Sequence, residues 1–332
     1  MTKSYYIGSF PPPYGGVSIK NALLYEAISK SVSLEKIVSE KRMILYVKTL
    51  GKLFRRDSKY VIGVSSRSGK SGLISTLLYR FNRNSMNQSI YFMMGGTEAD
   101  EISFSKKKLK VYENYKRVYV ETDSMKRKLV NAGMTNVEVY PNCRKKASFI
   151  NDIKKSDDRL KCVFLSSIQK EKGIEIVIDT AKELSEVEFY IYGNVKDDYR
   201  DEFFECIKGS ANTHYMGAFS WDSDMLYTLL SRYDIFLFPT LWSTEGVPGV
   251  LVEAKISGLV PIVSDMSYNS EIIEDGVDGI VLESNDCGGM KKAIEHLVVD
   301  RDKLQRMKLS SRDSADAYYI ENHIDRIIEV LR

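Results

Sequence analysis

Two glutamates flank a run of glycine and proline in a position where they could bind a sugar. Glu245 and Glu253 lie around the run Gly246-Val-Pro-Gly249, which follows an apolar segment at 235–239. A carboxylate accepts several hydrogen bonds, so both glutamates suit the hydroxyls of a sugar or a ribose. A helix starting near Gly249 would direct its free N–H groups and the positive end of its dipole toward a phosphate. The spacing alone also fits a solvated loop residue followed by a residue on a helix face.

The elements around this motif predict the edge of a parallel sheet. We expect a strand at 235–239 and a helix at 249–257, and ligands of open α/β sheets bind at the carboxyl ends of such strands. The same alternation of strands and helices runs along the chain and indicates doubly wound parallel sheets. Further strands are expected at 3–10, 59–65, 89–94, 117–121, 162–166, 187–192, 260–264 and 279–282, and further helices at 17–30, 73–81, 124–132, 173–184 and 287–299.

A polar stretch at 151–159 interrupts this alternation, which then starts again. We therefore expect an α/β protein of two Rossmann-like domains joined near residue 150. The first domain is predicted to span 1–150 and the second 151–310. Residues 311–332 should form a terminal segment with a helix near 320–331.

The two predicted domains also differ in net charge. The 332 residues carry a net charge of +3, but residues 1–150 carry +16 and residues 151–332 carry −13. Such asymmetry suggests an anionic partner for the basic half, either a nucleic acid or an anionic membrane, although it also fits a simple effect on solubility. The basic half lacks interleaved aromatic stacking motifs and its charges are scattered, so we expect no nucleic acid.

Cysteine usage and hydropathy exclude several protein classes. Four cysteines, at 143, 162, 206 and 287, are far apart and form no zinc-ligand pattern or disulfide framework. No signal peptide and no run of about 18 apolar residues is found. A cytoplasmic protein with no cofactor is the expectation.

Two motifs that suggest other chemistry are set aside. Gly63 to Ser71 resembles a phosphate-binding loop, but five residues instead of four separate Gly63 from the Gly69-Lys-Ser run. Asp222 and Asp224 could hold a divalent cation, but they precede a helical pattern, where aspartate caps are common. We expect capping there and no metal site.

Several motifs in order resemble family-4 retaining glycosyltransferases of the GT-B fold. Two segments resemble the donor domain of that family. They are the run from Glu245 to Ala254 and the glycine-containing run from Glu271 to Gly279. Phe164 to Gly173 looks like its first strand and basic loop, and Tyr192-Gly193 like a following strand end. Pro12 to Gly16 resembles its amino-terminal glycine loop. The resemblance implies two Rossmann-like domains facing a central cleft, with acceptor bound by the first and donor by the second.

The resemblance assigns roles residue by residue. Glu253 would bind the ribose hydroxyls, Glu245 would hold the donor sugar, and Lys172 would neutralise the diphosphate, so Glu245 and Lys172 are the candidate catalytic residues. The remaining donor-binding candidates are Gly15, Gly16, Lys170, Gly193, Gly246, Val247, Pro248, Gly249, Val250 and Leu251. The reaction implied is metal-independent transfer from a nucleotide-sugar to a glycan or lipid-linked acceptor with retention of configuration, as in cell-surface polysaccharide synthesis.

Two departures from the family pattern leave an alternative open. The family's usual arginine is Ser167 here, with Lys170 as a weaker substitute, and the segment 91–96 lacks the family's usual histidine. A degenerate GT-B module that supports another transferase is therefore the second hypothesis. The intact Glu245, Glu253 and Lys172 favour an enzyme.

One segment of the basic half predicts a membrane surface. Over Lys41–Arg56, apolar and basic side chains occupy opposite sides of a helical wheel, with Ile44 and Leu45 as exceptions. A core helix with a solvated basic face explains this pattern, and so does a helix lying on an anionic leaflet. The second interpretation predicts peripheral association with the inner face of the membrane.

Overall fold

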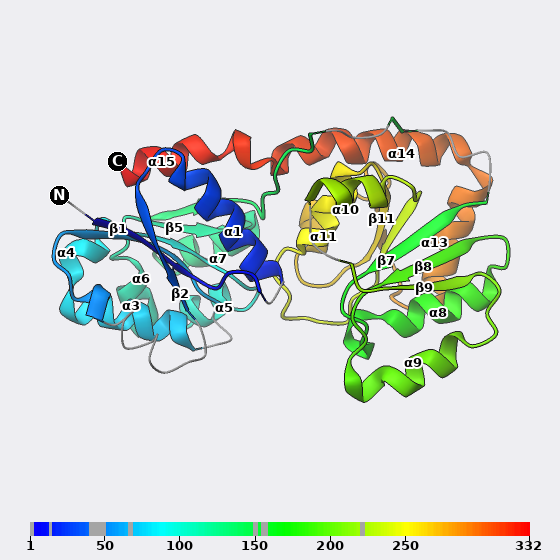
Figure 1. Cartoon of the computed structure of the whole chain (residues 1–332), viewed down its shortest axis with the longest axis horizontal. Helices are drawn as coiled ribbons and strands as arrows, with labels where there is room; N and C mark the ends of the chain where they lie inside the picture. Colours follow the sequence, from blue (N-terminus) through cyan, green and yellow to red (C-terminus); the bar gives the residue numbers. More distant parts are fainter. Residues whose placement is uncertain are drawn as a thin grey trace. The chain divides into compact units, whose positions relative to one another are not determined.

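The chain forms two compact units in a computed structural model, which describes residues 3–12, 15–39, 51–65, 69–148, 152–153, 159–219 and 223–332 (Figure 1). Unit 1 comprises residues 1–145, 244–247 and 318–332, and unit 2 comprises residues 146–243 and 248–317. The predicted helix over Lys41–Arg56 lies largely outside the described residues.

Unit 1 is built on a six-stranded parallel sheet in the order β2-β1-β3-β4-β5-β6. Its interior strands are short apolar runs because helices cover both faces, as parallel sheets require. The strands are β1 (Lys3–Gly8), β2 (Leu34–Val38), β3 (Ser58–Gly63), β4 (Ile90–Phe92), β5 (Arg117–Val120) and β6 (Val137–Val139).

Alternate residues of these strands pack against different helices. Tyr6, Val61 and Tyr119 join a core with α1 (Gly16–Ser29) and α15 (Ile324–Leu331), which lie side by side on one face (Figure 1). Tyr91 instead contacts the rings of Tyr112 and Tyr115, at and just after the end of α6. The other helices of unit 1 are α3 (Lys70–Phe81), α4 (Arg83–Met86), α5 (Glu98–Ser103), α6 (Lys106–Tyr112) and α7 (Asp123–Asn131).

Unit 2 repeats the plan with a parallel sheet in the order β12-β11-β10-β7-β8-β9. Strands β11 and β10 pair along the length of β10 and β7 pairs along the length of β8, while β10 and β7 pair over two residues, and inward residues of these strands line one core. The strands are β7 (Lys161–Leu165), β8 (Glu188–Tyr192), β9 (Thr213–Gly217), β10 (Ile235–Phe238), β11 (Val260–Ser264) and β12 (Ile280–Leu282).

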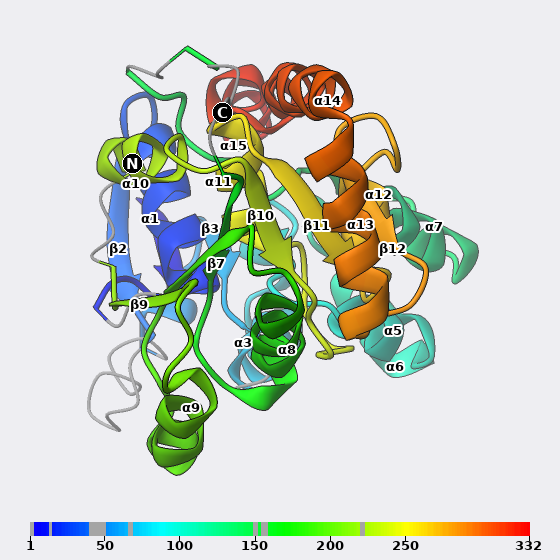
Figure 2. The same cartoon turned by 90° about the vertical axis from the view of Figure 1, so that its right-hand side faces the viewer.

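Helices cover this sheet as well. Helices α8 (Ile174–Glu183) and α13 (Cys287–Val299) pack side by side on the core (Figure 2). Helix α11 (Gly249–Ile256) packs against α10 (Ser223–Leu230) and α14 (Arg301–Ser314). The remaining elements are the 3-10 turns η2 (Lys170–Lys172) and η3 (Asp197–Tyr199) and the helices α9 (Arg200–Ile207) and α12 (Asn269–Ile272). Within the described ranges, no helix is long and apolar enough to cross a bilayer.

Candidate functional site

The sheet of unit 2 reverses its strand order between β7 and β10. From β7 the chain moves outward through β8 and β9, and it then returns to form β10 on the other side of β7. In open α/β sheets, ligands bind at the carboxyl edge beside such a reversal, next to the loops that follow the two central strands, which are β7 and β10 here. This edge carries Lys172 on one side and the loop 239–242 on the other.

Lys172 is placed by a glycine whose position leaves no room for a side chain without a shift of the backbone. Gly173 ends η2 with φ of 74°, and a Cβ there would lie 2.0 Å from the carbonyl oxygen of Pro239. This close approach brings the loop after β7 against the loop after β10. The Nζ of Lys172 consequently lies 5.1 Å from the ring centroid of Trp242 and 5.9 Å from that of Phe238, where the aromatic faces favour a cation.

The loop 239–242 is fixed by hydrogen bonds from three directions. The Leu241 N–H donates to the Glu171 carbonyl at 2.9 Å, and the Ser264 hydroxyl donates to the Thr240 carbonyl at 2.7 Å. The Asn285 amide donates to the same Thr240 oxygen at 3.3 Å. The sequence did not single out Trp242, Ser264 or Asn285, because their partners are far away along the chain.

Helix α11 starts at the same edge. Its N-cap is Pro248, in an extended conformation, and Gly249 and Val250 open the first turn. The positive end of the helix dipole lies there and suits an anion. The Leu251 N–H donates to the Pro248 carbonyl at 3.2 Å, so it is used within the turn.

Glu253 lies within α11 and is buried, with 3% of its surface exposed. Its backbone carbonyl accepts hydrogen bonds from the N–H of Ser257 at 3.1 Å and from the Ser257 hydroxyl at 2.8 Å. A buried lysine, Lys255, follows on the same helix and pairs with Asp278 at 2.8 Å. Desolvation lowers the pKa of this lysine, and its pairing makes it a structural residue.

Gly193 joins the ends of β7 and β8. Its φ is 145°, and a Cβ would lie 1.8 Å from the Ser166 carbonyl oxygen. The Tyr215 hydroxyl donates to the Gly193 carbonyl at 3.0 Å. Gly193 thus allows a close backbone approach beside the loop that carries Lys172.

Lys170 has other partners. Its Nζ lies 2.5 Å from a carboxylate oxygen of Glu202 and 3.2 Å from one of Glu175. The hydrogen bonds to these carboxylates raise the pKa of Lys170. In this arrangement it joins α8 and α9, and its predicted role as a substitute for the missing arginine at Ser167 remains a prediction.

Glu245, Gly246 and Val247 belong to unit 1. The Val247 N–H donates to Glu121 Oε2 at 3.0 Å, and the Asn142 amide donates to the Val247 carbonyl at 2.7 Å. Glu121 Oε1 pairs with Lys20 Nζ at 2.6 Å, and both side chains are buried.

The backbone around Glu245 is equally close to unit 1. A Cβ on Gly96 would lie 2.2 Å from the Glu245 carbonyl oxygen. The segment that carries Glu245 is therefore held at the carboxyl ends of β4 and β5. Sequence reasoning did not identify Lys20 or Glu121 as supports of this segment.

Gly15 and Gly16 open α1 beside the order reversal of the first sheet, where β1 lies between β2 and β3. The Gly15 N–H donates to the Ser18 hydroxyl at 3.0 Å. A Cβ on Gly16 would meet nothing within 4 Å, and one on Gly15 would meet only the Ser18 hydroxyl oxygen at 4.0 Å. The described residues of unit 1 therefore leave open space around both glycines.

The predicted aspartate pair is only partly described. Asp222 lies outside the described residues, and Asp224 accepts a hydrogen bond from the Ser148 hydroxyl at 2.6 Å. Among the described residues, no group of three or more histidine, cysteine, aspartate and glutamate side chains could hold a metal ion.

Comparison with known proteins identifies a family model and curated relatives that match part of the chain. A family model described as glycosyl transferases group 1 matches residues 145–314. An Escherichia coli UDP-Gal:alpha-D-GlcNAc-diphosphoundecaprenol alpha-1,3-galactosyltransferase is 31% identical over 108 residues, which are 32% of this chain and 27% of the relative. A Campylobacter jejuni N,N'-diacetylbacillosaminyl-diphospho-undecaprenol alpha-1,3-N-acetylgalactosaminyltransferase is 30% identical over 158 residues, 46% of this chain and 39% of the relative. The chain thus spans well under half the length of these curated relatives.

Solved structures resemble the whole chain. HepE from Anabaena, in complex with UDP, has a TM-score of 0.75 at 15% identity, and the match covers 100% of this chain and 99% of that one. Sucrose-phosphate synthase from Thermosynechococcus elongatus has a TM-score of 0.74 at 13% identity, with 99% and 98% covered. These likenesses confirm the predicted two-part α/β fold of the GT-B type.

Proposed function

Because the chain belongs to the glycosyl transferases group 1 family, we propose that it moves a sugar from a nucleotide-sugar donor to a glycan or lipid-linked acceptor. One observation carries this proposal. Lys172, the start of α11 and the buried Glu253 lie along one edge of the unit 2 sheet, where the strand order reverses.

The chemistry of transfer explains this set of residues. Breaking the bond between sugar and diphosphate leaves negative charge on the diphosphate, and fixed cations and dipoles stabilise that charge. Lys172 and the first turn of α11 provide them. Glu253 would accept hydrogen bonds from the ribose hydroxyls, and Glu245 would hold the transferred sugar.

We further propose UDP as the nucleotide and retention as the stereochemical outcome. The name of the Escherichia coli relative specifies UDP-Gal as donor, and the Anabaena structure contains UDP. The acceptor would attack the face from which the diphosphate departs, with no protein nucleophile. The diphosphate would be held without a metal.

The acceptor we propose is a lipid-linked glycan. Both curated relatives are named for sugars linked to diphosphoundecaprenol. The net charge of +16 on residues 1–150 would favour a surface rich in anionic lipid. The proposed location is the cytoplasmic face of the membrane, in the synthesis of a cell-surface polysaccharide or glycoconjugate.

A thermal-shift panel of nucleoside diphosphates and UDP-sugars tests the donor, followed by transfer assays with and without excess EDTA. A donor present at 100 times its Kd should stabilise the protein by about 2.7 kcal/mol. Slow hydrolysis of one UDP-sugar that survives EDTA would support the enzyme. Binding without any hydrolysis or transfer would instead favour the non-catalytic module, and activity restored only by manganese would overturn metal independence.

A further inference from the structure

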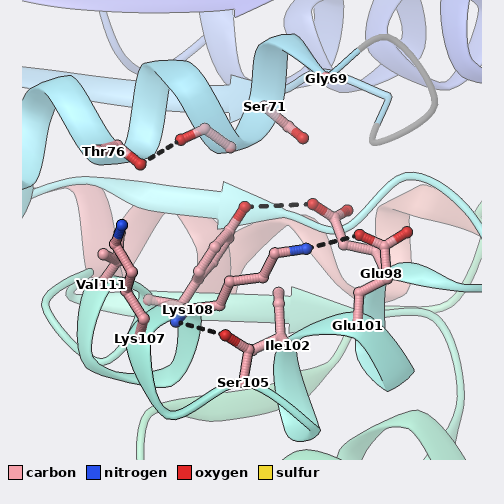
Figure 3. Close-up of a pocket in the computed structure, with 12 residues that line it drawn as sticks. Gly69, Ser71, Thr76, Glu98, Glu101, Ile102, Ser105, Lys107, Lys108 and Val111 are labelled. Atoms are coloured by element: carbon pink, nitrogen blue, oxygen red, sulfur yellow. Dashed lines mark hydrogen bonds and ion pairs between the residues drawn. The ribbon is translucent and has the colours of Figure 1, made fainter.

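The described part of unit 1 contains a cavity whose lining residues are separate from the candidate donor site. It has a volume of about 380 Å³ and lies between α3, α5 and α6 (Figure 3). Pockets that take small molecules have volumes of roughly 300–1,000 Å³. The cavity is therefore large enough for a ligand of the size of one sugar ring.

A buried glutamate lines this cavity. Glu98 is 2% exposed, and its Oε1 accepts hydrogen bonds from the Tyr91 hydroxyl at 2.5 Å and from the Tyr112 hydroxyl at 3.3 Å. By distance and angle, its Oε2 accepts no hydrogen bond from the part of the chain that the structure describes, although the Ser71 side chain and the Met94 backbone lie near enough to the carboxyl group to lower its pKa. A buried polar atom without a partner is costly, so a ligand that donates to Oε2 would explain why it is there. Burial raises the pKa of Glu98 to about 7.

The facing wall is the start of α3. Ser71 and Gly72 lie in the first turn of this 12-residue helix, where backbone N–H groups lack partners within the helix. Figure 3 shows Ser71 on the wall opposite Glu98. Ile102 and Val111 add apolar surface beside the ring of Tyr112.

The residues on the two walls determine which chemical groups of a ligand the cavity can bind. A phosphate only accepts hydrogen bonds, so it would suit the start of α3 but would be opposed by Glu98 whenever its carboxyl group is ionised. An ammonium group only donates, so it would suit Glu98 but not the helix terminus. A hydroxyl group both donates and accepts, and a sugar ring adds an apolar face of C–H groups.

We infer that this cavity binds a sugar residue of the acceptor glycan, with Glu98 Oε2 accepting a hydrogen bond from a ring hydroxyl and the first turn of α3 donating to a neighbouring one. The assignment to the acceptor rests on the proposed function. The binding of a sugar in this cavity does not depend on the proposed function, and it can be tested without enzymatic turnover.

Gly72 allows a test that leaves the fold intact. It lines the cavity, and a Cβ there would meet nothing within 4 Å. Alanine and leucine both favour a helix more than glycine does. Gly72→Leu should therefore fill the cavity, and Gly72→Ala is the matched control that adds one methyl group.

The experiment is ligand-observed NMR on the full chain with UDP present in excess. The probes are methyl glycosides of glucose, galactose, N-acetylglucosamine and N-acetylgalactosamine. We expect at least one to bind, Gly72→Leu to abolish its binding, and Glu98→Gln to weaken it about tenfold. Gly72→Ala and Glu113→Gln, which changes an exposed glutamate outside the cavity, should leave binding unchanged.

The outcomes separate this inference from the proposed function. Absence of UDP binding would count against the proposed function, and the glycoside titration without UDP would still test the cavity. If no glycoside binds the wild-type chain, or if binding persists in Gly72→Leu, the inference is wrong. If Glu98→Gln does not fold, the difference in glycoside binding between Gly72→Leu and Gly72→Ala decides whether the sugar binds in this cavity.

Discussion

Lys172 illustrates how one side chain depends on contacts that the sequence does not display. The run before Gly173 predicts a basic loop after a strand, and the structure has this loop. The aromatic partner Trp242 and the amide of Asn285 come from later segments. A local pattern identifies residues whose role depends on neighbours in the chain, whereas contacts between distant loops depend on the fold.

Removing the Glu253 carboxylate should weaken nucleotide binding. We expect Glu253→Ala to lose roughly 1.5–3 kcal/mol of affinity for UDP, because hydrogen bonds from the ribose hydroxyls to a charged acceptor disappear. Isothermal titration calorimetry measures this loss, and the exposed Glu283→Ala is the control. Unchanged affinity in Glu253→Ala would remove this residue from the donor site.

Glu98 should make stability depend on pH. Burial raises its pKa from 4.5 to about 7, so the folded state holds this proton more tightly than the unfolded state does. The contribution to stability is fully present below about pH 4.5 and is lost as the pH rises through 7, on the order of 3 kcal/mol. The facing hydroxyls of Tyr91, Tyr112 and Tyr115 have raised pKa values and stay protonated there.

Urea unfolding between pH 5 and pH 8 measures this effect. The free energy of unfolding of Glu98→Gln should rise relative to that of the wild type as the pH increases. Two curves that remain parallel across this range would show that Glu98 titrates normally.

At the scale of elements, position in the sheet decided what could be predicted. Interior strands such as β3, β7 and β10 are continuous apolar runs, because helices cover both of their faces. The expected strands at these places agree with the structure to within one or two residues at each end. We did not predict β2 and β6, the edge strands of unit 1, whereas β12, an edge strand of unit 2, was expected at 279–282. In β2 the neighbouring polar residues Glu35 and Lys36 resemble loop sequence, because both side chains are exposed.

Two glycines with the same backbone conformation test how the loops after β7 and β10 are held. Gly173 and Gly276 both have φ of 74°, but only a Cβ on Gly173 would overlap the Pro239 backbone. Gly276→Ala should lose about 1–2 kcal/mol of stability from its left-handed conformation alone. Gly173→Ala should lose more and should also bind UDP at least tenfold more weakly, because Lys172 moves with its loop.

Urea unfolding and calorimetry on both variants separate the two effects. Gly276→Ala reports the intrinsic cost of alanine in this conformation. A Gly173→Ala variant that binds UDP as tightly as Gly276→Ala would show that the close approach does not position Lys172.

At the scale of the whole molecule, the charge asymmetry predicts salt-dependent binding to anionic vesicles. Because most of the helix expected at Lys41–Arg56 is not described, the test uses another basic element. Phe104 is 88% exposed and directly precedes the lysine-rich α6. Each basic residue near an anionic surface contributes about 1 kcal/mol.

Co-sedimentation with vesicles of varied anionic lipid content and ionic strength measures this association. The double variant Lys106→Glu/Lys110→Glu should bind more weakly, and Lys208→Glu in the acidic half should bind as the wild type does. Absence of binding at low salt would point to an acceptor in solution. Binding that the α6 variant leaves unchanged would assign the contact to another basic segment.

Helix α15 has a consequence for how the protein is made. Ile327 and Leu331 complete the core beneath β1, and the Lys59 ammonium donates to the Leu331 carbonyl at 2.6 Å. Strand β1 is translated long before α15 and therefore waits for this helix before its core is closed. All of unit 2 lies between them in the chain, so its own core can form earlier. The amino-terminal half is then the last to mature, and a premature stop codon that removes α15 would expose apolar surface in the half that was synthesised first.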